Sequence, residues 1–350
     1  MLAVGAGAPA HASDDRYADA VAHTWRLADE VPADPGALQR ELVRHATLAA
    51  NGHNTQPWRF RSRWGGIDVE PDLARRTPVV DPDDHHLWAS LGCATENLVQ
   101  AALAFGRHAA VRVDGSGVRI ELEPTAPKRC ALFEAIAQRQ STRAAYDGRS
   151  LAPDELRALE RAAAADDVQT VVMTERRRIE QVRDFVVAAN SAQIADPAFI
   201  AELERWIRFS ADEALAQRDG LFARSSGNPT MPRWLGSAVF RLFFTAGREN
   251  DKIASQMRSS AGVAVFAANR ADASGWFAAG RACERFLLQA AALDVRTAFV
   301  NQPVEVAAVR AQFARAIGLG ERRPDLIVRF GRAPRLPPSL RRPVDAVMMS

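Results

Sequence analysis

The chain has 350 residues, of which 47% are hydrophobic and 25% are charged, so it can bury a large core like an ordinary globular protein. Its formal net charge of +3 is small for this length, and no dense stripe of basic residues is present, which excludes a typical nucleic-acid-binding protein. The sequence contains no apolar run of ~20 residues, so no membrane-spanning segment and no membrane partner are expected.

Residues 1–13 come first and lack a helix or strand pattern. They read MLAVGAGAPAHAS, in which the Ala-His-Ala ending is similar to a signal-cleavage site, although no basic segment precedes the short apolar part. We therefore expect a disordered tail or the remnant of an export signal. As written, the chain is expected in the cytoplasm, and a periplasmic location is the alternative if an export signal has been truncated.

The next stretch, residues 14–125, predicts a first half made of helices and two strand pairs. Gly65-Gly66 and Gly115-Ser116-Gly117 mark the two turns between strands, and Asp83 or Asp84 is the expected cap of the longest helix. The expected elements are helices at 14–30, 36–50 and 85–105 and strands at 57–63, 66–70, 108–113 and 117–123.

Residues 126–346 predict a second half with the same kinds of element. A segment at 219–235 is rich in Gly, Pro, Ser and Arg, and irregular segments of this length are often lids or binding loops. The other expected elements are helices at 130–139, 153–166, 176–218, 274–292 and 304–317 and strands at 168–174, 263–266, 296–300 and 325–330. In each half a long alanine-rich helix is followed by a strand.

Two polar motifs carry the chemistry. The first, Asn51 to Trp58, reads Asn-Gly-His-Asn-Thr-Gln-Pro-Trp and places amides and an imidazole on a loop that leads into a strand. Amides suit the edge of a heteroaromatic ring. The alternative is a plain turn, because Asn-Gly is a strong turn signal and the polar side chains can satisfy loop backbone.

The second motif, Arg139 to Arg143, reads Arg-Gln-Ser-Thr-Arg at the end of a predicted helix. Guanidinium groups bind phosphate oxygens in pairs, so two arginines and a hydroxyl suit a phosphate. The alternative is a solvated helix end, where arginine also favours the helix dipole. A ligand with a polar ring and a phosphate, such as FMN, fits both motifs.

Other sites are disfavoured. Asp81 to His86 contains metal-ligand residue types, but Pro-Asp-Asp is typical of a helix N-terminus, and we predict no metal site there. Ser225-Ser226-Gly227 has no Gly-x-Ser-x-Gly frame, which disfavours a serine hydrolase. No Gly-x-Gly-x-x-Gly motif follows a predicted strand, so a Rossmann-type dinucleotide fold has no support.

Together the two motifs resemble the nitroreductase superfamily of FMN enzymes, which carries Arg-x-Ser-x-Arg and Ser-x-x-Asn-x-Gln-Pro-Trp segments in that order. Here the order is reversed, with Thr77 to Pro82 between them, and this resembles the Acg-like branch, in which two half-degenerate copies are fused in one chain. The resemblance covers residues 37–346. The chain departs from the pattern at Ala50-Asn51, where the family has Pro-Ser before the Asn, and at Arg341-Arg342, where the family often has Lys.

The resemblance implies an α+β fold of three α-β-α layers, built as a tandem fused pseudo-dimer with a mostly antiparallel sheet in each half. One composite FMN site is expected between the halves. The implied cofactor-binding residues are Asn51, Gly52, His53, Asn54, Gln56, Arg139, Ser141, Arg143, Arg341 and Arg342. We name no catalytic residue, because in such enzymes the cofactor carries the chemistry.

The implied function is an FMN-dependent oxidoreductase that passes hydride from NAD(P)H through FMN to a nitro, quinone or similar acceptor. The alternative is a protein that binds or sequesters FMN with little turnover, with the segment 219–235 as a lid over the flavin. Bleaching of the flavin by NADH or NADPH would distinguish the two. The partner is then a small-molecule electron acceptor, and the chain is expected to be a monomer or a weak homodimer.

Overall fold

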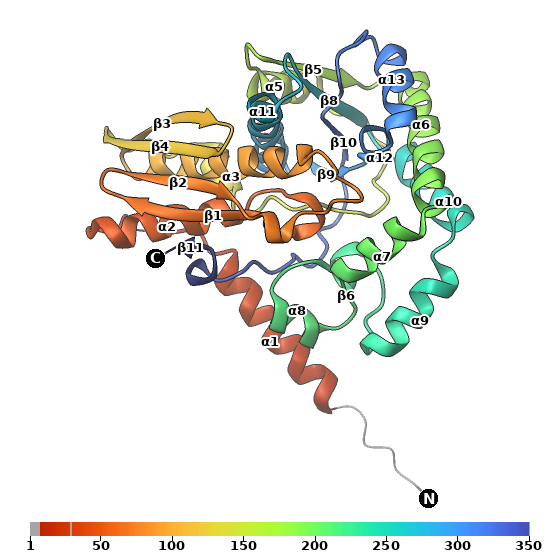
Figure 1. Ribbon diagram of the computed structural model, residues 1–350, viewed down its shortest axis with the longest axis horizontal. Coiled ribbons are helices and arrows are strands. Elements are labelled where there is room, and N and C mark those ends of the chain that lie inside the picture. The colour runs from red at the N-terminus through yellow and green to blue at the C-terminus, as the bar shows by residue number, and fades with distance from the viewer. Residues whose placement is uncertain (1–7, 29, 350) are drawn as a thin grey trace, which may run out of the picture.

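The computed structural model of the chain describes residues 8–28 and 30–349, which form two main β-sheets on either side of a central pair of long helices (Figure 1). Mixed helices and mainly antiparallel sheets confirm the predicted α+β class. The long helices of the central pair are α3 (His85–Ala104) and α11 (Ala273–Ala292), one from each predicted half.

The first sheet has the strand order β11-β1-β2-β4-β3 and is antiparallel except where β11 pairs with β1. Its inner face packs on α3 and on α2 (Pro35–Thr47), while ion pairs such as Arg61–Glu70 and Arg63–Asp68 lie on the outer face. This alternation leaves the first sheet covered on one face. Its strands are β1 (Trp58–Arg63), β2 (Gly66–Pro71), β3 (Arg107–Asp114), β4 (Gly117–Pro124) and β11 (Met348–Met349).

The second sheet is antiparallel, in the order β5-β8-β10-β9, and is covered on both faces. Along β8 the residues Ala264 and Phe266 face the core around α11. Val263 and Val265 face three other helices, α6 (Arg176–Ile194), α10 (Ala246–Arg258) and α13 (Ala307–Ala316). Three α-β-α layers are therefore complete around this sheet. Its strands are β5 (Val168–Met173), β8 (Gly262–Ala268), β9 (Arg296–Phe299) and β10 (Leu326–Gly331).

The central helices approach each other closely through one glycine from each. A Cβ on Gly92 would overlap the carbonyl oxygen of Phe277, and a Cβ on Gly280 would overlap that of Ala89. Each glycine begins the same pattern, Gly-x-Ala-x-Glu, at 92–96 in α3 and 280–284 in α11. This repeated crossing supports the internal pseudo-dimer, which stays a prediction.

Several predicted elements are divided or shifted in the structure. The expected helix 176–218 is broken because Pro197 cannot continue it, and Asp196 instead caps a new helix by accepting from Ala198 N. The expected helix 304–317 is also two helices. The segments concerned are α6 (Arg176–Ile194), α7 (Pro197–Trp206), β6 (Ile207–Arg208), α8 (Ala211–Gln217), α12 (Gln302–Glu305) and α13 (Ala307–Ala316).

The segment 219–235 is more regular than expected. It contains β7 (Leu221–Phe222), which pairs with β6, then η3 (Ala223–Ser226) and the start of α9 (Arg233–Phe243). A further helix, α10 (Ala246–Arg258), then leads to the second sheet. Together with α7 and α8, the elements β7, η3 and α9 lie below the central helices, whereas α10 lies beside α6 (Figure 1).

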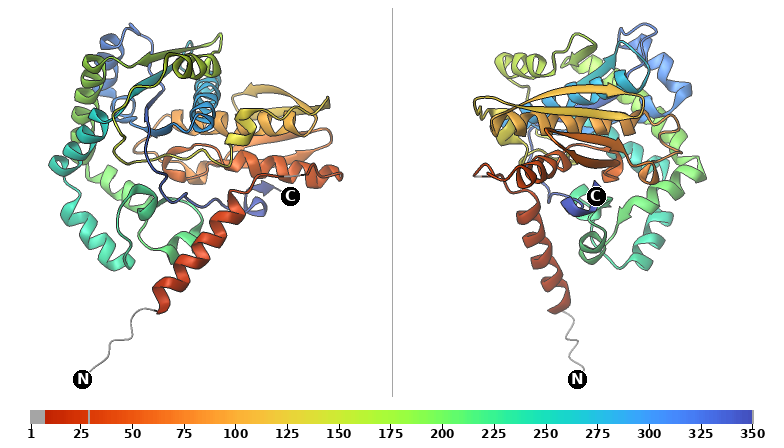
Figure 2. Two further views of the ribbon diagram at one scale, coloured as in Figure 1. Left: turned by 180° about the vertical axis from the view of Figure 1, so that it is seen from behind. Right: turned by 60° about the vertical axis from the view of Figure 1, so that its left-hand side comes forward.

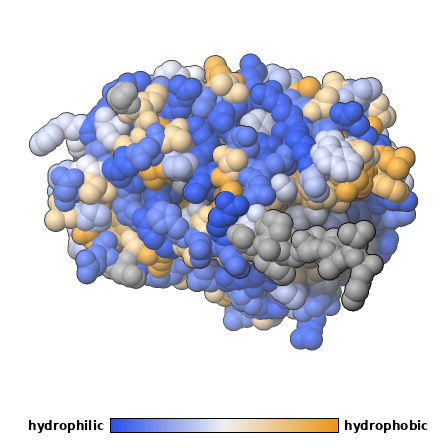
Figure 3. Space-filling model, turned by 90° about the horizontal axis from the view of Figure 1, so that it is seen from below, coloured by the Kyte–Doolittle hydropathy of each residue, from blue (hydrophilic) through white to orange (hydrophobic). Residues whose placement is uncertain are grey.

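The predicted tail 1–13 overlaps the first helix, α1 (Ala8–Thr24), so residues 8–13 are helical, and residues 1–7 lie outside the described part of the chain. Figure 2 shows α1 extending away from the body, and its Tyr17 ring packs 4.6 Å from that of Phe222. Among the described residues no helix has the length and apolar character needed to cross a bilayer. The surface seen from below is largely hydrophilic, with scattered apolar patches (Figure 3).

The start of α3 also differs from the prediction, which gave its cap to Asp83 or Asp84. Asp84 has a left-handed backbone with φ of 59° and makes no capping hydrogen bond. Asp81 caps the helix instead, because its two carboxylate oxygens accept from His86 N and Leu87 N at 2.9 and 3.0 Å. The Asp81–His86 segment thus forms the N-terminus of a helix, as predicted, through a different aspartate.

Candidate functional site

Two adjoining cavities bring the predicted motifs together. The larger, of ≈ 280 Å³, lies among η1 (Gly52–Asn54), α3, α6, α7, α10, α12 and the ends of β9 and β10. The smaller, of ≈ 50 Å³, is lined by the Arg139–Arg143 segment and by residues 337–341. Ala50, Asn51, Arg143 and Leu221 line both cavities, so the two form one elongated site.

The Asn51–Trp58 loop has an unusual backbone. His53, Asn54 and Gln56 have φ values of 46°, 53° and 54°, a left-handed region that non-glycine residues seldom adopt. Such strain persists only where the surroundings fix it, and it gathers at functional sites. Asn51 Oδ1 accepts from Gln56 N at 2.8 Å and so holds the loop across the strained residues.

Two amides of this loop tie it to distant segments. Gln56 Nε2 donates to Arg218 O at 2.9 Å, and its Oε1 accepts from Arg342 N at 2.8 Å. Asn54 Nδ2 donates to Gly220 O and Leu340 O, at 3.0 and 3.2 Å. Asn54 Oδ1 is buried and has no hydrogen-bond partner among the described residues. Both ends of the Gln56 amide are therefore engaged by backbone, whereas Asn54, which lines the smaller cavity, retains a free acceptor.

The Arg139–Arg143 segment follows the short helix α4 (Ala131–Ala135) and runs along β9. Ser141 pairs with Thr297 of β9 in a parallel bridge, and Thr142 N donates to Thr297 O at 2.8 Å. Arg139 is buried: its Nη2 donates to Leu48 O at 3.0 Å, and its Nε lies 3.2 Å from Glu284 Oε1. The second sheet thus fixes this segment against the loop of the first half.

Three guanidinium groups of the site face no carboxylate within ion-pair distance among the described residues, namely those of Arg143, Arg329 and Arg341. Arg341 is held by carbonyl oxygens at the end of α2, including Thr47 O at 2.8 Å, and burial together with the charge of Arg139 lowers its pKa to about 9. Burial also lowers the pKa of Arg143. Arg143 makes no side-chain hydrogen bond among these residues and lines both cavities, so its positive charge is available to a ligand.

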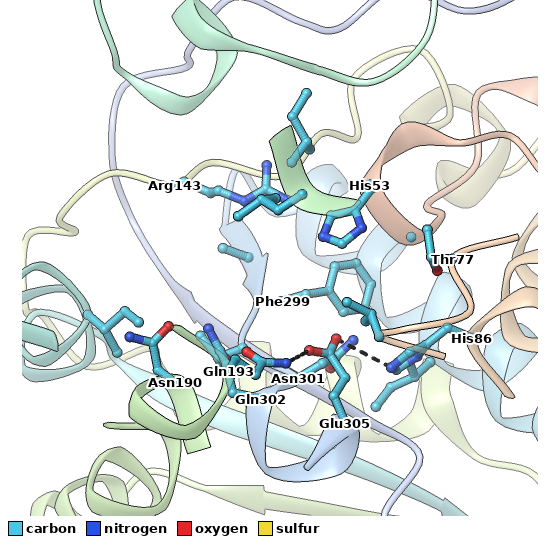
Figure 4. A pocket seen from close by; sticks show the side chains of 18 of the residues that line it. His53, Thr77, His86, Arg143, Asn190, Gln193, Phe299, Asn301, Gln302 and Glu305 are labelled. Carbon is cyan, nitrogen blue, oxygen red and sulfur yellow. Dashed lines mark hydrogen bonds and ion pairs between the residues drawn. The ribbon is translucent and has the colours of Figure 1, made fainter. Parts of the chain in front are cut away.

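The far end of the larger cavity is a wall of amides, imidazoles and one carboxylate (Figure 4). His86 Nε2 lies 3.4 Å from Glu305 Oε1, and Gln193 Nε2 donates to Glu305 Oε2 at 2.5 Å. Burial lowers the pKa of His53 to about 4, with Glu305 opposing the shift, so this ring is neutral near pH 7. The polar residues that Figure 4 labels around the whole cavity are His53, Thr77, His86, Arg143, Asn190, Gln193, Asn301, Gln302 and Glu305.

The structure brings most of the predicted site residues together. The predicted residues that line the two cavities are Asn51, Gly52, His53, Asn54, Arg139, Ser141, Arg143 and Arg341. Gln56 and Arg342 do not line either cavity: Gln56 is buried in backbone hydrogen bonds, and Arg342 lies in a separate basic groove beside α2. Of the segment 219–235, Leu221 lines both cavities and Ser225 lines the smaller one.

The residues of the far wall were not identified from the sequence. Asn301 and Gln302 directly follow a predicted strand, a position where polar side chains often reach a site, and this signal could have found them. His86 was assigned only to a helix start. Arg329 lies inside the predicted strand 325–330, and it is 1% exposed and lines the larger cavity. Among the described residues, no group of three or more His, Cys, Asp or Glu side chains could hold a metal.

The chain is similar to two curated proteins of Mycobacterium tuberculosis, from strains CDC 1551 and H37Rv, each named as a putative NAD(P)H nitroreductase. In both cases 26% of residues are identical over 325 residues, covering 88% of this chain and 90% of the relative. No family model matches the chain. The resemblance to nitroreductases predicted from the motifs is confirmed by these relatives, while the fusion of two halves stays a prediction.

Solved structures with a similar arrangement include two nitroreductases with bound FMN. The protein from Bacteroides fragilis is 15% identical, with a TM-score of 0.36, and the match covers 58% of this chain and 88% of that one. The protein from Desulfitobacterium hafniense is 13% identical, with a TM-score of 0.40, and the match covers 64% of this chain and 100% of that one.

Proposed function

We propose that this chain is an FMN-dependent oxidoreductase of the nitroreductase type, which passes hydride from NAD(P)H to a nitro, quinone or similar small acceptor. The observation that carries the proposal is the composite site, in which Asn51–His53 and Arg139–Arg143 line adjoining cavities although 85 residues separate His53 from Arg139 in the sequence. The names of the curated relatives support NAD(P)H as the reductant.

The residues present fit FMN at both ends. The unpaired guanidinium groups of Arg143 and Arg341 give two positive charges, and a phosphate monoester carries about −1.5 to −2 at neutral pH. The Ser141 and Ser225 hydroxyls line the same small cavity and can donate to phosphate oxygens. The free acceptor of Asn54 suits a hydroxyl of the sugar-alcohol chain.

The larger cavity would hold the ring system, and its volume approaches the ~300 Å³ at which ligand pockets begin. Asn51, Gly52 and the neutral His53 would contact the ring edge, where amide and imidazole groups can both donate and accept. When bound, FMN supplies the hydride-transfer chemistry. The protein's part is then to orient the ring, exclude water and bind the acceptor in the remaining space.

A visible spectrum of the purified full-length chain tests the proposal. We expect a yellow protein that releases about one FMN per chain on heating, because one composite site is built from single copies of the two motifs. Added NADH or NADPH should bleach the flavin, and a quinone should restore the colour. A colourless chain that takes up no added FMN would overturn the proposal. If the chain binds FMN but neither nucleotide bleaches it, the chain is an FMN-binding protein without turnover.

A further inference from the structure

The far end of the larger cavity contains a histidine–carboxylate pair for which the proposed function gives no role. His86 belongs to α3 and Glu305 to α12, and the two approach to 3.4 Å where these helices border the cavity (Figure 4). Their side chains are 9% and 16% exposed. The pair is therefore nearly buried but adjoins the space left for an acceptor.

The imidazole of His86 is fixed in orientation. Asp81 accepts from His86 N at 2.9 Å and fixes the backbone, while Glu305 engages Nε2 and is itself held by Gln193. Nδ1 of His86 makes no hydrogen bond among the residues that the structure describes. A carboxylate that orients one ring nitrogen leaves the other to act on a ligand, as in other histidine sites where a partner sets the proton's position.

The charges around His86 favour its protonated form. Burial alone lowers its pKa, but Glu305 and Asp81 outweigh this, and the net effect is a pKa raised above 6.5. Arg323 opposes the rise. The other rings nearby stay neutral, because burial lowers the pKa of His53 to about 4 and that of His85 well below its ordinary value. Of these three imidazoles, His86 is thus the one whose surroundings favour the protonated form.

The same end of the cavity also offers a free acceptor. Gln302 Oε1 is buried and has no hydrogen-bond partner among the described residues, and Gln302 lines the cavity together with His86. One proton donor and one free acceptor suit a ligand that arrives with carbonyl oxygens and leaves with hydroxyl groups. A quinone that becomes a hydroquinone has this chemistry.

We propose that the far end of the larger cavity binds a small quinone and that His86 is the acid that protonates it during reduction. This inference rests on the proposed function. The quinone gains two electrons and two protons: the hydride from NAD(P)H carries both electrons and one proton, and the Nδ1–H of His86 gives the other to a quinone oxygen. The Nδ1–H bond breaks as the O–H bond forms, and neutral His86 then regains a proton from water.

The first test mixes the flavin-reduced full-length protein with p-benzoquinone and follows the return of flavin absorbance between pH 5.5 and 9. The wild-type rate should fall about tenfold per pH unit above the pKa of His86. His86→Asn should be slower at pH 6, on the order of 10²-fold, and should lose this pH dependence. Glu305→Gln should keep it but move it to lower pH, because the anion that favours imidazolium is removed.

His108→Asn is the matched control, since His108 is an exposed histidine on β3, and it should keep the wild-type profile. The protein is reduced in parallel with NADPH and with dithionite, so that failure of the nucleotide reaction is separated from failure of the acid. Bleaching by NADPH should be unchanged in His86→Asn. A wild-type rate independent of pH, or a His86→Asn profile equal to wild type, overturns the inference and leaves the proposed function standing.

A second readout needs no cofactor. An imidazole NMR titration of the full-length chain, assigned by the signals missing in His86→Asn, should give a His86 pKa above 6.5 that drops in Glu305→Gln. A His86 signal already neutral at pH 6 would overturn the assignment of an acid. If the chain takes up no FMN, the spectrum shows this before any quinone is added, and the proposed function and this inference fail together.

Discussion

The two helices of the central pair carry the same sequence pattern in different surroundings. Each helix has a glutamate four residues after its crossing glycine, Glu96 in α3 and Glu284 in α11, and both are at most 1% exposed. Glu284 contacts other segments: Arg139 Nε lies at 3.2 Å, and Ala50 N donates to its Oε2 at 3.2 Å. Glu96 instead pairs with two arginines of the neighbouring helix, Arg281 and Arg285, at 2.9 and 3.2 Å.

The difference shows what converts a structural ion pair into part of a site. At Glu96 both guanidinium groups come from α11, so the pair ties two helices together. At Glu284 the partners are a loop arginine and a loop amide, and both Ala50 and Arg139 line the small cavity. The carboxylate therefore positions the two motifs relative to each other. The glutamate of α3 thus stabilises the helix pair, and its counterpart in α11 assembles the ligand site.

The largest expected effect comes from removing each glutamate in turn. Breaking a buried ion pair by deleting one partner costs about 3–5 kcal/mol, so Glu284→Ala and Glu96→Ala should each lower the free energy of unfolding by that order. FMN affinity should differ between them. We expect Glu284→Ala to lower the FMN affinity by at least about tenfold, or ~1.4 kcal/mol, because Arg139 and Ala50 lose the carboxylate that both contact.

Urea unfolding and FMN titration on both variants measure this contrast. Because both variants should lose similar stability, a difference in FMN affinity between them cannot come from general destabilisation. If Glu96→Ala weakened FMN binding as much as Glu284→Ala, the two glutamates would not differ in function. If neither variant changed FMN affinity, Glu284 would have no role in positioning the motifs.

A smaller effect is expected at Arg143, which has no ion-pair partner among the described residues. Arg143→Ala should weaken the free energy of FMN binding by about 1.5–3 kcal/mol, the usual value of a hydrogen bond to a charged group. The free energy of unfolding should change little. Arg143→Lys should weaken FMN binding less, because Lys keeps the charge but loses the bidentate geometry. The control at the other glutamate is Arg285→Ala, which should lower stability through Glu96 and leave FMN binding unchanged.

Sequence reasoning found the parts of the site that are short and contiguous. Asn51–Trp58 and Arg139–Arg143 each concentrate their polar groups in a few residues, and the chemistry of those side chains is enough to indicate a ring and a phosphate. Within those segments, however, the sequence does not show which side chains line the cavities and which only hold the loop in place. Gln56 resembles a ligand amide in the sequence, but it binds Arg218 O and Arg342 N because the loop folds back under the C-terminal segment.

The far wall of the cavity could not be predicted, because tertiary packing assembles it from single residues of several elements. His86, Gln193 and Glu305 are separated by more than 100 residues at each step, and each alone reads as an ordinary helix residue. The missed helix break at Pro197 has a simpler cause. Asp196-Pro197 is a helix-start signal, but the expected helix 176–218 runs across it.

The smallest expected effect distinguishes the two glutamates by pH. Burial raises the pKa of the Glu284 carboxyl above its ordinary value of 4.5, with Arg139 opposing the shift. The folded state then holds this proton more tightly than the unfolded state, so the stability from this group is complete below pH 4.5 and falls as pH rises through the raised pKa. Glu284→Gln cannot ionise, so the unfolding free energy of wild type minus that of Glu284→Gln should fall over this window.

Urea unfolding of wild type, Glu284→Gln and Glu96→Gln at several pH values between 4 and 8 measures the slope, that is, the change in unfolding free energy with pH. Glu96→Gln keeps Glu284 and should therefore retain the part of the wild-type slope that Glu284→Gln loses. Bound FMN should change this pH dependence, because a phosphate beside Arg341 neutralises a cation that now favours ionised Glu284, so the titration is run on flavin-free protein. If the unfolding free energies of wild type and Glu284→Gln changed in parallel with pH, Arg139 would compensate fully for the burial of Glu284. The ionisation of neither glutamate would then make stability depend on pH in this range.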